Sequence, residues 1–216
     1  MMDYLERLLF HGKLNRTARI ILVLAGLAFF IAIALPLWQM TMISNQFPEG
    51  LRVRIYPYKL EGDLQEINIL NHYVGMATLD AEFFPELQLL PLIFAGGGLL
   101  TLLTAGLGYR WLASEVLLGG GLASALSTTI LIYRLYSYGH NLDPMAPIDI
   151  DPFMPPPLGV NQLANFHVTT FFHIGTAVFA LGLIGIIAAL WVSRPLAEQR
   201  PGDQASGSVP RVLMSR

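Results

Sequence analysis

The chain has 216 residues, of which 54% are hydrophobic and 13% charged, and its formal net charge is −2. Soluble domains carry about 25% charged residues, so the composition excludes an ordinary soluble protein, and the net charge gives no reason to expect a nucleic-acid partner. The chain has no cysteine, which excludes disulfides, thiolate zinc sites, CxxCH haem attachment and CxxxC copper carriers.

Residues 1–17 place apolar and charged side chains at helical spacing. The apolar positions are Leu5, Leu8, Leu9 and Phe10, and the charged positions are Asp3, Glu6 and Arg7. This pattern predicts a short amphipathic helix on the cytoplasmic surface of a membrane.

Four apolar stretches follow, at residues 18–37, 87–108, 112–133 and 169–192. A bilayer core of about 30 Å requires roughly 20 apolar residues in a helix, and each stretch reaches that length. The first stretch is longer than a typical signal-peptide core, and no A-x-A site follows it, so we expect it to be retained. The chain is therefore predicted to be an all-α membrane protein with a four-helix transmembrane domain at residues 18–192.

Lys and Arg are shared unevenly between the two sides that four spans define. One side collects nine basic residues, which are Arg7, Lys13, Arg16, Arg19, Arg110, Arg194, Arg200, Arg211 and Arg216. The other side holds Arg52, Arg54, Lys59 and Arg134. Because basic residues favour the cytoplasm, both termini should be cytoplasmic in a bacterial inner membrane, with outer loops at 39–86 and 134–165. The tail, 193–216, is predicted to be disordered.

The first outer loop contains a pattern typical of strands. Residues 51–60 alternate apolar and polar side chains, a turn follows at Glu61, Gly62 and Asp63, and residues 65–70 offer a return strand. We therefore expect a short β-hairpin outside the membrane. Asp80 should cap a short helix that leads into Glu86 and the second span.

The second and third spans each carry a triple glycine, at residues 96–98 and 119–121. Only three residues separate the two spans, so they should form an antiparallel hairpin. Missing side chains let helix backbones approach closely, and we expect the two triplets to pack together. The alternative is a helix break that lines a transport path.

The second outer loop carries six prolines between residues 144 and 157. Such a segment should be extended and ordered only by packing on other parts of the outer face. We expect residues 143–158 to join the hairpin region in one small cap over the helix ends. The expected contacts join Ile148, Ile150, Phe153 and Leu158 to Ile55, Ile67, Ile69 and Tyr73.

Histidine and methionine are concentrated on the predicted outer side. Thioether and imidazole ligands without a carboxylate cluster suit copper better than calcium or magnesium. The candidate ligands are His72, Met76, His140, His167 and His173. His72 and Met76, four residues apart, would share one face of a helical turn. His167 and His173, six apart, could serve one site only if the helix start is irregular or each meets a different partner.

Two other interpretations of these residues stay open. Loop methionines often pack a small core, and interfacial histidines often hydrogen-bond neighbours such as Asn71 or Asn141. Haem b is a second cofactor to consider, with His140 and His173 as axial ligands. Haem usually requires two facing helices inside the membrane, whereas we expect His140 to lie just beyond its helix.

Four stretches resemble an uncharacterised family of bacterial four-span membrane proteins. They are residues 47–56 (FPEGLRVRIY), 70–76 (LNHYVGM), 138–147 (YGHNLDPMAP) and 159–166 (GVNQLANF). Together with the helix order, the resemblance covers most of the chain. It implies an association with nitrous oxide reductase and with the maturation of other periplasmic copper enzymes, without implying an activity or a ligand set.

From these patterns we expect a non-enzymatic accessory protein of the inner membrane. It would handle copper at its outer face or hold a periplasmic copper protein during assembly. The alternative is a non-catalytic structural subunit of a larger respiratory or photosynthetic membrane complex. An enzyme is not expected, because the sequence has no nucleophile elbow, HExxH motif, phosphate loop or paired buried carboxylates.

Overall fold

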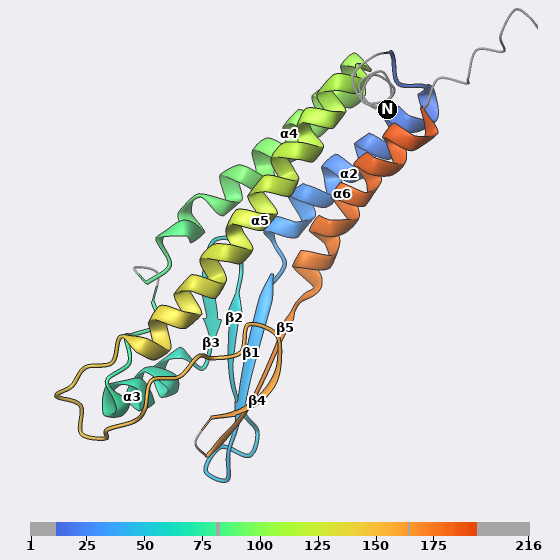
Figure 1. The fold of residues 1–216 in the computed structure, drawn as a ribbon. Coiled ribbons are helices and arrows are strands. Elements are labelled where there is room, and N and C mark those ends of the chain that lie inside the picture. The colour runs from blue at the N-terminus through green and yellow to red at the C-terminus, as the bar shows by residue number, and fades with distance from the viewer. Residues whose placement is uncertain (1–11, 81–82, 164, 194–216) are drawn as a thin grey trace, which may run out of the picture.

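The computed structural model describes residues 12–80, 83–163 and 165–193. Within these residues, four helices are long and apolar enough to cross a membrane, as the sequence predicted. They are α2 (Arg16–Ile33), α4 (Leu90–Leu107), α5 (Arg110–His140) and α6 (Ile174–Val192). Figure 1 shows them side by side, with a sheet extending from one end of the bundle. Residues 1–11 of the predicted amphipathic helix lie outside the described residues. The same holds for residues 194–216 of the predicted tail.

α2 packs closely against α4 and α6 through small residues. A Cβ atom added to Gly98 of α4 would lie 3.1 Å from the backbone oxygen of Gly26 and 2.7 Å from the Phe30 ring. On the other side, a Cβ atom on Gly182 of α6 would lie 3.0 Å from the Phe29 ring. Glycine at these positions therefore lets three of the helix backbones approach.

The predicted contact between the glycine triplets is wrong. Cβ atoms added to Gly97 of α4 or to Gly119 and Gly121 of α5 would meet nothing within 4 Å. Gly98 faces α2, and a Cβ atom on Gly120 would meet Leu183 of α6 at 2.7 Å. The reason is that α4 takes α2 as its close partner, although α5 is its neighbour along the chain.

The predicted hairpin is part of a larger antiparallel sheet with the strand order β3-β2-β1-β5-β4. Its strands are β1 (Trp38–Ile43), β2 (Leu51–Ile55), β3 (Leu60–Gly62), β4 (Gly159–Leu163) and β5 (Phe166–Phe172). The start predicted for the fourth span, at residue 169, is therefore wrong. Residues 169–172 belong to β5, and the helix begins at Ile174. α2 leads into β1 and β5 leads into α6, so neighbouring helices align these strands for pairing.

The predicted return strand at residues 65–70 is also wrong. These residues belong to α3 (Leu64–Val74), which buries Ile67 and Asn71 at helical spacing and ends at Gly75 with a φ of 74°. A six-residue apolar alternation does not separate strand from helix, and burial of one helical face decided the outcome here. The predicted helix cap at Asp80 is wrong, because Oδ1 of Asp80 accepts a hydrogen bond from the Phe83 amide at 2.9 Å ahead of the helix, and the N-cap residue is Phe84, which makes no side-chain capping bond. The helix is the short 3-10 helix η1 (Pro85–Gln88).

One face of the sheet packs against α3 and the end of α5 to form a compact core. Its buried residues include Trp38, Met40, Val53, Ile55, Ile67, Leu135, Tyr138 and Val168. Met42 packs against the same cluster. Three of the methionines in the predicted outer loops, Met40, Met42 and Met76, therefore serve packing.

The proline-dense loop crosses this core as predicted, but backbone hydrogen bonds hold it in place. The amide of Asp143 donates to the oxygen of Gly75 at 2.8 Å, and that of Ile148 donates to the oxygen of Tyr73 at 3.0 Å. The predicted apolar contacts are incomplete, because Ile148 is 51% exposed and Leu158 is 61% exposed. Prolines leave few internal bonds, so the remaining amides bond to neighbouring elements.

Candidate functional site

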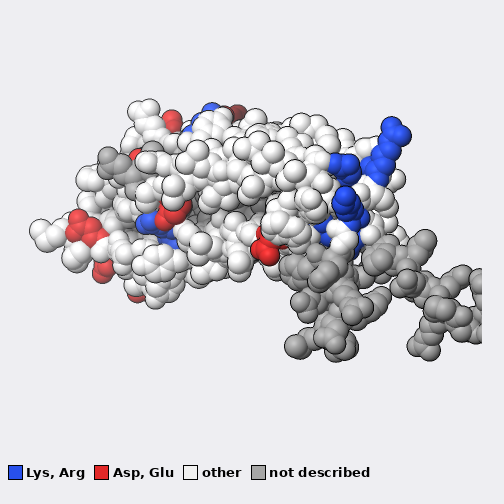
Figure 2. Space-filling view, turned by 90° about the horizontal axis from the view of Figure 1, so that it is seen from above, with Lys and Arg blue, Asp and Glu red and all other residues white. Residues whose placement is uncertain are grey.

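The two ends of the molecule differ in charge. At the end of the bundle away from the sheet, the described basic residues are Lys13, Arg16, Arg19 and Arg110, with Glu115 as the described acidic residue. The sheet end carries most of the acidic residues. Figure 2 shows a group of Lys and Arg side chains at one end of the molecule and most of the visible acidic side chains toward the other end. The sheet end also carries the basic residues Arg52, Arg54, Lys59 and Arg134, so the two ends differ in their acidic residues and not in their number of described basic residues.

His72 and Met76 do not share a helical face, contrary to the prediction. α3 ends at Val74, and the left-handed Gly75 turns the chain before Met76. Met76 packs against the core below the sheet. His72 is exposed, with its ring edge-on to Tyr73 at 6.1 Å between centroids. The two side chains therefore leave α3 in different directions.

His140 is the last residue of α5, although it was expected beyond the helix. Its ring stacks on Tyr136 at 3.8 Å, and Nδ1 lies 2.9 Å from the Tyr136 carbonyl oxygen. Asp143, three residues later, bonds to Gly75 at the end of α3. The ends of α3 and α5 thus meet at one corner of the cap, which contains His72, Met76 and His140.

His167 and His173 lie at opposite ends of β5. His167 pairs with Ile43 at the far tip of the sheet, whereas His173 directly follows the strand. A strand rises about 3.3 Å per residue, so six residues separate them by about 20 Å. These two histidines cannot bind one metal ion together.

His173 also has a structural role at the start of α6. Its Nδ1 accepts a hydrogen bond from the amide of Ile174 at 2.8 Å, and its ring stacks against Phe171 at 5.6 Å. It caps the helix, so it is not inside the span as expected. Over the part of the chain that the structure describes, no three His, Asp or Glu side chains gather as a metal site.

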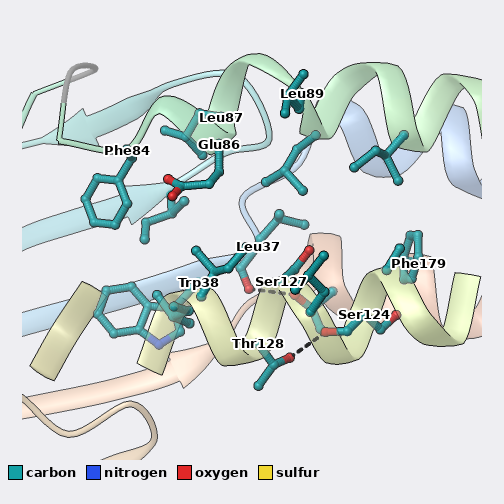
Figure 3. Close-up of a pocket in the computed structure, with 18 of the residues that line it drawn as sticks. Leu37, Trp38, Phe84, Glu86, Leu87, Leu89, Ser124, Ser127, Thr128 and Phe179 are labelled. Carbon is teal, nitrogen blue, oxygen red and sulfur yellow. Dashed lines mark hydrogen bonds between the residues drawn. The ribbon is translucent and has the colours of Figure 1, made fainter. Parts of the chain in front are cut away.

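A cavity of about 360 Å³, which the sequence did not indicate, lies where the helices meet the sheet. Trp38, Ile55 and Phe172 line it from the sheet, and α4, α5 and α6 supply the other walls. Figure 3 shows Glu86 and Trp38 on opposite sides of this space. Two charged residues at its edge, Glu86 and Arg134, appeared in the sequence only as isolated charges beside two spans.

Glu86 and Arg134 form an ion pair at the edge of the cavity. Nη2 and Nε of Arg134 both donate to Oε1 of Glu86, at 2.6 and 3.1 Å. The Arg134 guanidinium also lies over the Phe83 ring, 5.7 Å from its centroid. The second carboxylate oxygen, Oε2, is buried and has no hydrogen-bond partner among the described residues.

Comparisons with protein-family models, curated proteins and solved structures found no match to this chain.

Proposed function

We propose that this chain is a non-enzymatic accessory protein of the bacterial inner membrane that handles copper or assists the assembly of a periplasmic copper enzyme. The observation that supports this proposal is the corner formed by the ends of α3 and α5. It brings His72 and His140 to one part of the cap, where Met76 follows α3 and packs against the core. His167 and His173 are left out of the copper site.

Imidazole and thioether ligands suit copper, particularly Cu(I). Nδ1 of His140 is engaged with the carbonyl of Tyr136, so Nε2 is the nitrogen available to a metal. His72 is exposed on α3, and Met145, in the loop that joins the corner, is 87% exposed. Exposed ligands on the rim of a cap favour transfer of copper to a partner over permanent storage.

Cu(I) titration of the detergent-purified protein tests the copper site. We expect one tightly bound ion in the unmodified protein and loss of that binding in His72→Ala and His140→Ala. His167→Ala is the matched control, because it removes an exposed imidazole from the far tip of the sheet. Absence of copper binding, or equal binding by all variants, would overturn the proposal.

The proposed orientation places the sheet in the periplasm and both termini in the cytoplasm. Because the chain has no cysteine, single cysteines can report on each side. A membrane-impermeant maleimide should label Tyr58→Cys in spheroplasts and should label Lys13→Cys only after lysis. The reverse pattern would invert the topology and place the copper site in the cytoplasm.

The second candidate is a non-catalytic subunit of a larger membrane complex, and the free face of the sheet favours it. The core covers only one face, and the other presents Thr41, Arg52, His167 and Thr169. Such a mixed polar surface can dock another protein. A stoichiometric complex that survives copper chelation and the loss of His72 would favour this candidate over copper handling.

A further inference from the structure

The cavity beside the sheet opens between helices that are suited to cross the membrane. α4 contributes Leu90 and Phe94, α5 contributes Ser127 and Leu131, and α6 contributes Phe179. The Phe94 and Phe179 rings stack at 4.6 Å between centroids. The volume of about 360 Å³ is within the range of small-molecule sites, about 300–1,000 Å³.

The walls are mostly hydrocarbon, and most of the hydroxyl groups in them are already bonded. Thr128 donates to the carbonyl of Ser124 at 2.9 Å, Ser124 donates to Gly120 at 2.8 Å, and Thr176 donates to Leu37 at 2.8 Å. Figure 3 shows the bond between Thr128 and Ser124 on the α5 wall. Apolar cavities hold water poorly, so an apolar chain is the better occupant.

Among the buried side-chain polar atoms of the described residues, the one without a hydrogen-bond partner is Oε2 of Glu86. Both nitrogens of Arg134 bond to the other carboxylate oxygen, which leaves Oε2 buried without a partner among the residues described. A buried acceptor without a donor is unfavourable, especially beside lipid. A bound molecule that donates a hydrogen bond at this position would remove that penalty.

We propose that the cavity binds a membrane lipid that has one apolar chain and an uncharged head with a donating hydroxyl group. The chain would lie between α4 and α5, and the hydroxyl would donate to Oε2 of Glu86. An uncharged head fits because Glu86 and Arg134 already neutralise each other. Isoprenoid quinols and long-chain alcohols both have this chemistry.

Fluorescence of Trp38 offers a direct test, because this residue lines the cavity. The other two tryptophans can be replaced as Trp111→Phe and Trp191→Phe, which leaves one reporter in the full chain. Dibrominated stearyl alcohol should quench Trp38 saturably in detergent micelles. The methyl ester of the matching dibrominated acid lacks the donor and should bind about tenfold more weakly, the effect expected for one hydrogen bond to a charged group.

Two variants test the hydroxyl head and the apolar chain of the ligand separately. Glu86→Ala should weaken binding of the alcohol about tenfold and leave the ester unchanged. Ser127→Phe should fill the cavity and abolish saturable quenching by both probes without touching the ion pair. Thr129→Phe is the matched control, because Thr129 is an exposed α5 residue outside the cavity.

Competition with decylubiquinol distinguishes an isoprenoid quinol from a long-chain alcohol as the ligand. Displacement of the brominated alcohol by the quinol much more strongly than by stearyl alcohol would assign the site to quinols. Equal displacement would assign it to hydroxyl-headed lipids in general. Equal quenching by alcohol and ester, or unchanged quenching in Ser127→Phe, would overturn the proposal.

Discussion

α2 and α5 are both apolar enough to cross a membrane, yet they are packed in opposite ways. α2 lies between α4 and α6 and buries Ala18, Leu22, Ala25, Gly26 and Phe29 along its length. In α5, the most apolar 18-residue window buries no residue inside the described structure. Hydropathy therefore identifies a span but not its position in the bundle.

The two helices are packed differently because the small residues of α2 lie against those of α4, whereas two glycines of α5 contact no other helix. Gly26 and Gly98 bring α2 and α4 into backbone contact, whereas Gly119 and Gly121 of α5 face open space. Close approach of backbones supplies the dispersion contacts that hold helices together in lipid. The loosely packed α5 leaves room for the cavity, while its C-terminal end is held by the core below the sheet.

The largest expected effect comes from breaking the packing of α2. Gly98→Val places side-chain carbons against the Gly26 carbonyl and the Phe30 ring and should destabilise the bundle by about 1–3 kcal/mol or more. Thermal unfolding in detergent measures this change. Gly97→Val is the matched control on the same helix and should leave stability unchanged, since no atom lies within 4 Å of its Cβ position. Equal losses in both variants would contradict the contrast between the two packing environments.

A second large effect is expected at the end of the bundle beside the termini. Arg110 is only 1% exposed, and its Nη1 donates to the backbone oxygen of Ser193 at 2.6 Å and to the Ser193 hydroxyl. Arg110→Ala should destabilise the protein by about 2–3 kcal/mol, because bonds made by a charged group are lost. Arg16→Ala removes an exposed cation nearby and should change the unfolding temperature little. A small effect of Arg110→Ala would show that the end of α6 is held by other contacts.

A smaller effect is expected where the proline-dense loop meets the sheet. Nε1 of Trp38 donates to the carbonyl oxygen of Pro157 at 2.8 Å. Trp38→Phe removes this bond, worth about 1 kcal/mol, and should speed proteolysis within residues 143–158 about fivefold if cleavage follows local opening. Trp111→Phe, at the other end, should leave the rate unchanged. Rapid cleavage in the unmodified protein would show that the loop is not held by the cap.

The smallest effect is expected at the exposed turn that joins β2 and β3. Lys59 and Glu61 pair at 2.6 Å; the hydrogen bond from Lys59 lowers the pKa of Glu61 below the ordinary 4.5 and the same bond raises the pKa of Lys59 above 10.5. The pair therefore contributes at intermediate pH and is lost as pH falls below about 4.5 or rises above about 10.5. Because both groups are exposed, Glu61→Gln should leave the unfolding temperature unchanged at pH 7. A measurable drop would show that this turn contributes to the stability of the cap.

The sequence by itself determined the features that depend on neighbouring residues. A run of about 20 apolar side chains favours a membrane-spanning helix wherever it lies, so four spans were predictable. The alternation at residues 51–60 identified a strand, and prolines identified an extended loop that depends on other elements.

Only the tertiary structure decided which distant segments meet. β1 and β5 pair because α2 and α6 bring them together across more than a hundred residues, and this pairing draws residues 169–172 out of the predicted span. The same long-range packing separates His167 from His173 and joins Glu86 to Arg134. Such contacts depend on the shape complementarity of helices far apart in the chain, which local composition and periodicity do not encode.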